Sequence, residues 1–253
     1  MHRQNARVRR DVLSRYRGSF GGVVWTVMHP LLLMVTYFLV FGIVLQSRFG
    51  NDPSRTGFAL YFLAGMLPWL ALNEPAARAP YVIWENRTFV KRLVFPVSVL
   101  PLNHAFSALV TSLLATAVFL CAVAVIKGAV PWTASLLPLL VFPLALFSLG
   151  LCWFLATAGV FVRDLVQVMT FLLTLWFFLT PICYEEAKIP VALFPWLAKN
   201  PMFQLVRFYR QILLEGAVPN AMAMTKVWVV SLAFFIGGYA CFARCRKTFP
   251  DVV

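Results

Sequence analysis

The chain carries few side chains that could perform catalysis. Its 253 residues include nine Asp and Glu, three His and 22 Lys and Arg. The sequence has no GxxxxGK[ST] loop for phosphates, no HExxH zinc motif and no GxSxG nucleophile motif. Two acids adjoin only at Glu185-Glu186. A membrane enzyme acting on a lipid-linked sugar would normally have acids or histidines grouped near one interface. The pair Glu185-Glu186 alone is a weak indication of such an enzyme.

The cysteines indicate neither a metal site nor a disulfide framework. They form no CxxC pair and have no His at metal-ligand spacing. Four of the five lie in or beside apolar runs, where cysteine usually behaves as a small hydrophobic residue. The five are Cys121, Cys152, Cys183, Cys241 and Cys245.

Composition places the chain in the membrane. Hydrophobic residues make up 61%, charged residues 12%, and the mean hydropathy is +0.82. The length suits about six spans of ~20 residues in a single domain, 1–253. The net charge of +13 is explained better by membrane topology than by nucleic acid, so we expect no nucleic-acid partner.

The apolar runs predict an all-α membrane protein with six transmembrane helices. The predicted spans are 23–45, 58–80, 97–126, 136–161, 165–184 and 227–242. Most Lys and Arg then fall on the side of both termini, and this bias predicts that the N- and C-termini are cytosolic.

The segment 84–96, between the second and third spans, is basic and amphipathic. Apolar Phe89, Val90, Leu93 and Val94 recur at three- and four-residue spacing. The topology places this predicted helix on the cytosolic surface, where a partner could dock. The candidate docking residues are Glu85, Asn86, Arg87, Phe89, Lys91 and Arg92.

Residues 1–22 form a second basic amphipathic segment. Its arginines either hold the N-terminus in the cytosol or belong to an interfacial helix that meets anionic headgroups or a phosphorylated substrate. Both interpretations remain open.

The segment 185–222 is too apolar for an ordinary loop. Asn200 is a predicted helix cap, Pro201 occupies the first helical position and Gly216 ends the pattern. We expect two short re-entrant or interfacial helices on the outer side, or alternatively a lid lying flat in the headgroups. The predicted apolar face comprises Met202, Leu205, Val206, Tyr209, Ile212 and Leu213.

Two further features have alternative interpretations. Glu74 is either a functional acid within a span or the partner of Arg78 one turn later. Aromatic residues of spans 1 and 5 either pack and face lipid or line a conduit on which sugar rings stack. They are Trp25, Tyr37, Phe38, Phe41, Phe171, Trp176, Phe177 and Phe178.

An ordered set of short motifs resembles ABC-2-type polysaccharide export permeases. The match departs from the family at His29, where Asn is commoner. The motifs are Arg15–Ser19 with Trp25 and His29–Leu32, Phe62–Trp69, Val90–Pro96 with Leu100-Pro101, Val160–Asp164, Thr180–Tyr184, and Asn200-Pro201.

The resemblance implies a transport subunit rather than an enzyme. Two copies would form a conduit from spans 1 and 5, and two copies of a cytosolic ATPase, which would bind ATP and Mg, would dock on 84–96 as the coupling helix. The substrate would be a lipid-linked O-antigen, teichoic acid or capsule polysaccharide crossing the bacterial inner membrane. Arg10, Arg15 and Arg17 would contact its phosphate. An exporter of a small amphiphile or drug, and a membrane enzyme, are the alternatives.

Overall fold

The computed structural model describes residues 28, 32, 35–36, 38–44, 55–91 and 96–253. Every regular element in these ranges is a helix. Four helical stretches among them are long and apolar enough to cross a membrane: Thr56–Glu85, Val99–Lys127, Trp132–Phe161 and Ala221–Cys245. They correspond to the second, third, fourth and sixth predicted spans, so the all-α membrane class is confirmed.

The long helices have the following bounds. α3 (Arg55–Arg78) continues through the turn η2 (Ala79–Tyr81) into α4 (Val82–Glu85). It is followed by α6 (Val99–Lys127), by α7 (Leu137–Phe161) with its preceding turn η3 (Trp132–Leu136), and by α11 (Ala221–Cys245).

The predicted count of six spans stays a prediction. α8 (Leu165–Leu179) has 15 residues and is therefore about 22 Å long, less than the ~30 Å of a bilayer core. The expected fifth span 165–184 thus ends five residues early as a helix. Most of the expected first span lies outside the described residues, apart from single helical positions and the π-helical segment η1 (Phe38–Val44).

α7 and α11 pack at very short distance because glycines face each other. A Cβ on Gly238 would overlap the backbone of Gly150, and a Cβ on Gly150 would overlap the backbone of Phe234. In a membrane, where the hydrophobic effect does not drive helices together, such small residues allow the backbones to approach.

Polar side chains satisfy the backbone where proline interrupts α3. Pro75 has no N–H, so the carbonyl of Ala71 lacks its helical partner. The buried hydroxyl of Ser148 on α7 donates to this carbonyl at 3.1 Å. At a second position, where proline does not remove the helical partner, the buried Ser112 on α6 donates to the carbonyl of Leu67 at 2.7 Å. These bonds tie α3 to both neighbouring helices.

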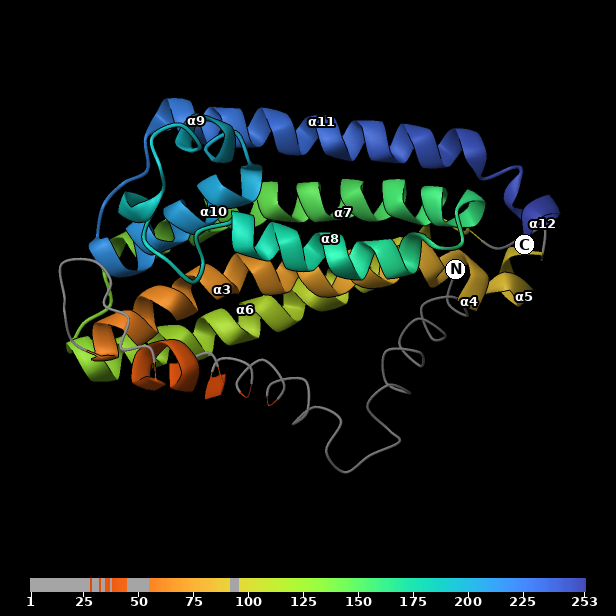
Figure 1. Cartoon of the computed structure of the whole chain (residues 1–253). Helices are drawn as coiled ribbons and strands as arrows, with labels where there is room; N and C mark the ends of the chain where they lie inside the picture. The colour runs from red at the N-terminus through yellow and green to blue at the C-terminus, as the bar shows by residue number, and fades with distance from the viewer. Residues whose placement is uncertain (1–27, 29–31, 33–34, 37, 45–54, 92–95) are drawn as a thin grey trace.

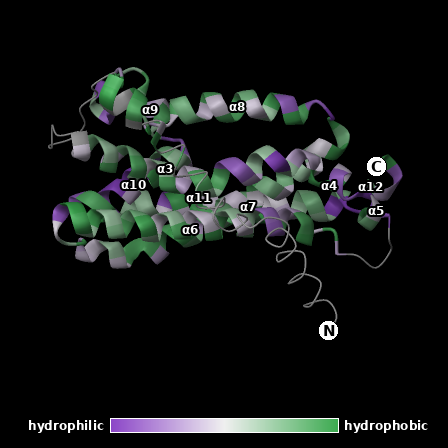
Figure 2. Cartoon of the chain, turned by 90° about the horizontal axis from the view of Figure 1, so that it is seen from below, coloured by the Kyte–Doolittle hydropathy of each residue, from purple (hydrophilic) through white to green (hydrophobic). Residues whose placement is uncertain are grey.

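The short helices gather at opposite ends of the bundle (Figure 1). α4, α5 (Arg87–Val90) and α12 (Phe249–Val252) lie at one end, which we call the α5 end. The other end, which we call the α10 end, carries η4 (Glu186–Lys188), α9 (Phe194–Leu197), α10 (Pro201–Arg210) and the π-helical turn η5 (Gln211–Glu215). Figure 2 shows predominantly apolar long helices, with much of the hydrophilic colour around α4, α5 and α12.

Candidate functional site

The predicted docking segment bends at Asn86. Trp84 and Glu85 belong to α4 and so continue the α3 helix, whereas α5 is a single turn, Arg87–Val90. Asn86 has φ −107° and ψ 23°, and its side chain donates to the carbonyl of Val82 at 2.9 Å. Residues 92–95, including Arg92, lie outside the described part of the chain. The role of 84–96 as a coupling helix stays a prediction.

Trp84 ties this segment to the end of α7. Its indole Nε1 donates to the carbonyl of Gly159 at 3.2 Å, and the guanidinium of Arg163 lies 4.7 Å from its ring centroid. Gly159 has no room for a side chain, because a Cβ would overlap the carbonyl of Pro80. The Val160–Asp164 motif therefore lies directly against the predicted docking segment.

α5 presents its polar residues and one aromatic ring to the surroundings. Val90 is buried in a cluster with Ile83, Phe242 and Phe249, so α12 forms part of its support. Phe89 is 45% exposed. Glu85, Arg87 and Lys91 are also exposed, whereas Asn86 is half-buried.

At the opposite end, Asn200 is the predicted cap of α10 and also a link to α8. Its Oδ1 accepts from the backbone N–H of Met202 at 3.0 Å and from the indole of Trp176 at 3.0 Å. Its amide nitrogen donates to the hydroxyl of Thr180 at 3.2 Å. The predicted apolar face of α10 is buried throughout, and Gly216 (φ 65°) ends η5 as expected.

Arg210 is the central residue of this end, although it was not among the residues predicted from the sequence. The residue is 1% exposed. Its guanidinium donates to the carbonyls of Tyr61 (3.1 Å), Pro181 (2.6 Å) and Ile182 (2.9 Å), and it lies 3.8 Å from the centroid of the Tyr61 ring. One side chain thus joins α10, α3 and the segment after α8.

A sequence signal for Arg210 exists. Phe203, Val206 and Leu213 occupy the same stripe of the helix at three- and four-residue spacing, and all are buried. A lone arginine within an apolar stripe must find acceptors inside the protein. Gly65, in the Phe62–Trp69 motif, makes room for it, because a Cβ there would lie 2.9 Å from Nη2.

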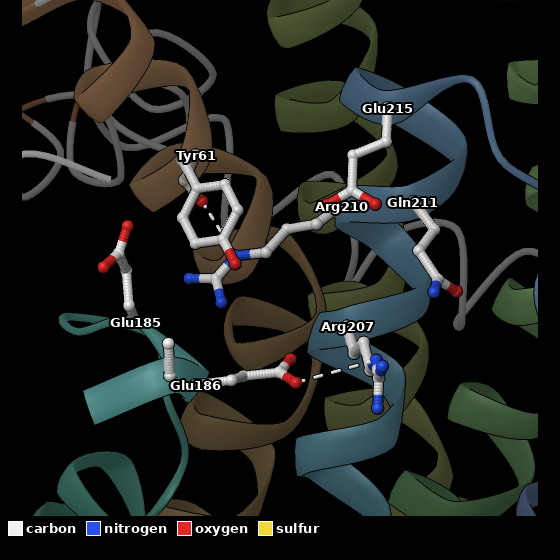
Figure 3. Close-up of a pocket in the computed structure, with 8 residues that line it drawn as sticks. Tyr61, Glu185, Glu186, Arg207, Arg210, Gln211 and Glu215 are labelled. Carbon is white, nitrogen blue, oxygen red and sulfur yellow. Dashed lines mark hydrogen bonds and ion pairs between the residues drawn. The ribbon is translucent and has the colours of Figure 1, made fainter. Parts of the chain in front are cut away.

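A polar cavity of about 360 Å³ opens beside Arg210 (Figure 3). Glu186 and Arg207 form an ion pair across it, with Nε and Oε2 3.6 Å apart. Burial raises the pKa of the Glu186 carboxyl, and the charges of Arg207 and Arg210 partly oppose that shift. The cavity is lined by Tyr61, Glu185, Glu186, Ala187, Arg207, Arg210, Gln211 and Glu215.

The predicted conduit aromatics fall into two groups on α8. Phe171 is 67% exposed and Phe178 is 53% exposed. Phe177 is buried and Trp176 half-buried, and their ring centroids lie 5.5 Å and 6.1 Å from that of Trp69.

Of the predicted aromatics in the first span, Phe38 and Phe41 lie on η1, but their side chains are not described. Trp25, Tyr37 and the predicted phosphate contacts Arg10, Arg15 and Arg17 lie outside the described residues.

Glu74 pairs with Arg78 one turn later, which is the structural alternative predicted from the sequence. Its carboxylate lies 3.4 Å from Nη2 of Arg78, and both side chains are about half exposed. Among the described residues, no three His, Cys, Asp or Glu side chains lie close enough to hold a metal ion.

The sequence matches the family described as "ABC-2 type transporter" over residues 5–214. The chain belongs to the ABC-2 type transporter family. It is 31% identical to the "O-antigen export system permease protein RfbA" of Myxococcus xanthus, covering 97% of this chain and 93% of that protein. Two proteins of the same name from Klebsiella pneumoniae are each 24% identical, covering 96% of this chain and 92% of theirs.

Family membership confirms the resemblance that the motifs indicated. This ABC-2 chain is a multi-pass membrane protein and a transport subunit, not an enzyme. An ABC-2 permease also implies an ATPase partner.

Proposed function

We propose that the chain is the permease subunit of an ATP-driven exporter that moves a lipid-linked polysaccharide of the O-antigen type across the bacterial inner membrane. The observation that carries this proposal is its similarity along almost the whole chain to the Myxococcus xanthus O-antigen export permease. Two copies of the chain would form the conduit, with both termini in the cytosol. Two copies of the ATPase would bind ATP and Mg.

The α5 end is the surface suited to the ATPase. Its exposed residues are Glu85, Arg87, Phe89 and Lys91. Their segment is attached to the bundle, because Val90 is buried and Trp84 bonds to α7. α4 continues α3 without a break into the bundle. A displacement of α5 by ATPase closure would therefore be transmitted along a single long helix.

The conduit would lie along α8 of both copies. Phe171 and Phe178 are exposed on the surface of the single chain and offer apolar ring faces for sugar C–H groups. Phe177 and Trp176 would support this face from the protomer core. The N-terminal arginines Arg10, Arg15 and Arg17 would contact the phosphate of the lipid anchor.

The related exporter of a small amphiphile or drug has less support, because the three similar proteins are all named O-antigen export permeases. A membrane enzyme using Glu185 and Glu186 has still less, because Glu186 is held in an ion pair with Arg207.

Docking is tested by co-purification of the ATPase with a charge-reversed variant, Arg87→Glu/Lys91→Glu/Arg92→Glu. The matched control reverses three exposed basic residues around the C-terminal end of α11, Arg244→Glu/Arg246→Glu/Lys247→Glu. We expect the first variant to lose ATPase association and surface polysaccharide while the control keeps both. Unchanged association in the first variant would contradict the docking surface.

A further inference from the structure

The cavity at the α10 end has no part in the coupling surface or in the aromatic face of α8. It lies between the first turns of α3, which carry Tyr61, the η4 turn, which carries Glu186, and the end of α10 with η5 (Figure 3). Under the predicted topology this end faces away from the cytosol, where a polysaccharide would emerge.

The walls of the cavity are held rigidly. Arg210 fixes α3 and the Pro181-Ile182 backbone to α10 through three hydrogen bonds. Asn200 fixes the end of α8 to the start of the same helix. A preformed cavity spends little binding free energy on ordering its own side chains, and about 360 Å³ falls within the ~300–1,000 Å³ common for small-ligand sites.

The lining is rich in hydrogen-bond acceptors. Glu185, Glu186 and Glu215 contribute carboxylates, and Gln211 contributes an amide. The Oε1 atom of Gln211 is buried and has no hydrogen-bond partner among the described residues. Of the two guanidinium groups, that of Arg210 is already committed to three carbonyls and that of Arg207 to Glu186.

The excess of hydrogen-bond acceptors over available donors in the lining favours one class of ligand. A phosphate would meet three carboxylates and no uncommitted guanidinium, so an anion is disfavoured. A metal ion would have to share the cavity with two arginines, which repel it. A neutral ligand with many hydroxyl donors suits carboxylate and amide acceptors, since hydrogen bonds to charged acceptors are the stronger kind.

We propose that this cavity is a saccharide subsite that takes one hydroxyl-rich sugar residue of the emerging polysaccharide. The sugar hydroxyls donate to the carboxylate of Glu215 and to the Oε1 atom of Gln211, which has no other partner among the described residues. The inference rests on the proposed function, because it assumes that a polysaccharide passes this end.

The test uses the full complex of this chain with its ATPase in lipid nanodiscs. The probe is an oligosaccharide of one or two repeats of the host's own surface polysaccharide, freed of its lipid, and binding is measured by saturation-transfer NMR and calorimetry. We expect Glu215→Gln/Gln211→Ala to weaken binding about tenfold or more, because hydrogen bonds to a charged acceptor are lost. The matched control Glu74→Gln changes a half-exposed glutamate of α3 that lies about 20 Å along the helix from Tyr61, and it should bind as wild type.

A second variant removes no charge. Ala187 is exposed on the cavity wall, so Ala187→Trp should fill the space without disturbing the core and should abolish binding. Equal binding by wild type and both cavity variants would overturn the subsite, as would no binding by the wild-type complex.

Export in cells separates the two proposals. If deleting the chain leaves surface polysaccharide intact, the proposed function fails and the subsite fails with it. If export requires the chain but the oligosaccharide does not bind at the cavity, the subsite alone fails.

Discussion

At the scale of single residues, Arg210 does most to determine the structure of the α10 end. A buried guanidinium is costly to desolvate unless all its donors are used. Here three backbone carbonyls accept from it, and the Tyr61 ring covers its face. Two of these carbonyls follow the end of α8 at Thr180, where the helix has stopped and its backbone needs partners inside the protein.

Arg210→Met should destabilise the protein strongly, because buried carbonyls left without donors cost roughly 1–3 kcal/mol each. The measurement is the thermal unfolding midpoint of the detergent-purified chain. Arg207→Met removes a half-exposed guanidinium from the same helix and should cost less than about 1 kcal/mol. Equal effects of the two substitutions would refute the role assigned to Arg210.

Glu186 supplies a pH dependence at this end. Its folded pKa is raised by burial above the unfolded value. Below the unfolded pKa the Glu186 carboxyl is protonated in both states and does not lower the free energy of unfolding. As the pH rises through the folded pKa, ionisation of the half-buried carboxyl lowers the free energy of unfolding. Relative to Glu186→Gln, which does not titrate, the wild type should lose stability between acidic and neutral pH. A difference that stays constant, or one of opposite sign, would contradict the shift.

At the scale of elements, local signals predicted the structure well and distant contacts were missed. Each signal that bounds this helix depends only on residues close in sequence: the cap Asn200, Pro201 and the terminal Gly216. α10 also has the predicted apolar face. The bond from Arg210 to Tyr61 joins residues 149 positions apart, which no local pattern reveals. Hydropathy did not show that α8 ends before Thr180, because Ile182 and Cys183 remain apolar. Pro181 was the local signal for this end, since the residue before a proline is disfavoured in a helix.

The α7–α11 contact makes a matched glycine prediction possible. Gly238→Ala should destabilise the bundle by about 1–3 kcal/mol or more, because the new methyl group overlaps the backbone of Gly150. The neighbouring Gly237→Ala places its methyl in open space and should be neutral or slightly stabilising. Thermal unfolding of the two purified variants, compared side by side, tests the close packing; similar midpoints would refute it.

The exposed aromatic face of α8 can be tested against its buried support. Phe171→Ser/Phe178→Ser should lower polysaccharide export with little change in the unfolding midpoint, because both rings are exposed. Phe177→Ser should lower the midpoint, because it removes a buried ring packed on Trp69. Export is measured as surface polysaccharide per cell at equal membrane levels of each variant. Normal export by the double variant would contradict the proposal that α8 lines the conduit.

At the scale of the whole molecule, the two ends differ in surface character and are joined by long helices. The α5 end is basic, exposed and braced by α7 and α12, which suits a partner that supplies energy. The α10 end encloses a polar cavity within a hydrogen-bonded frame, which suits contact with an emerging hydrophilic chain. α3 runs between them, reaching the first end as α4 and the second at Tyr61.

The proposed export function is tested most directly by transport with purified components. The chain and its ATPase are reconstituted in vesicles with the lipid-linked polysaccharide on the ATPase side, and the polymer that reaches the other side is measured with and without ATP. We predict transfer that requires ATP, requires this chain and is lost in the Arg87→Glu/Lys91→Glu/Arg92→Glu variant. Transfer at the same rate without ATP, or no transfer by a complex that hydrolyses ATP normally, would contradict the proposed export function.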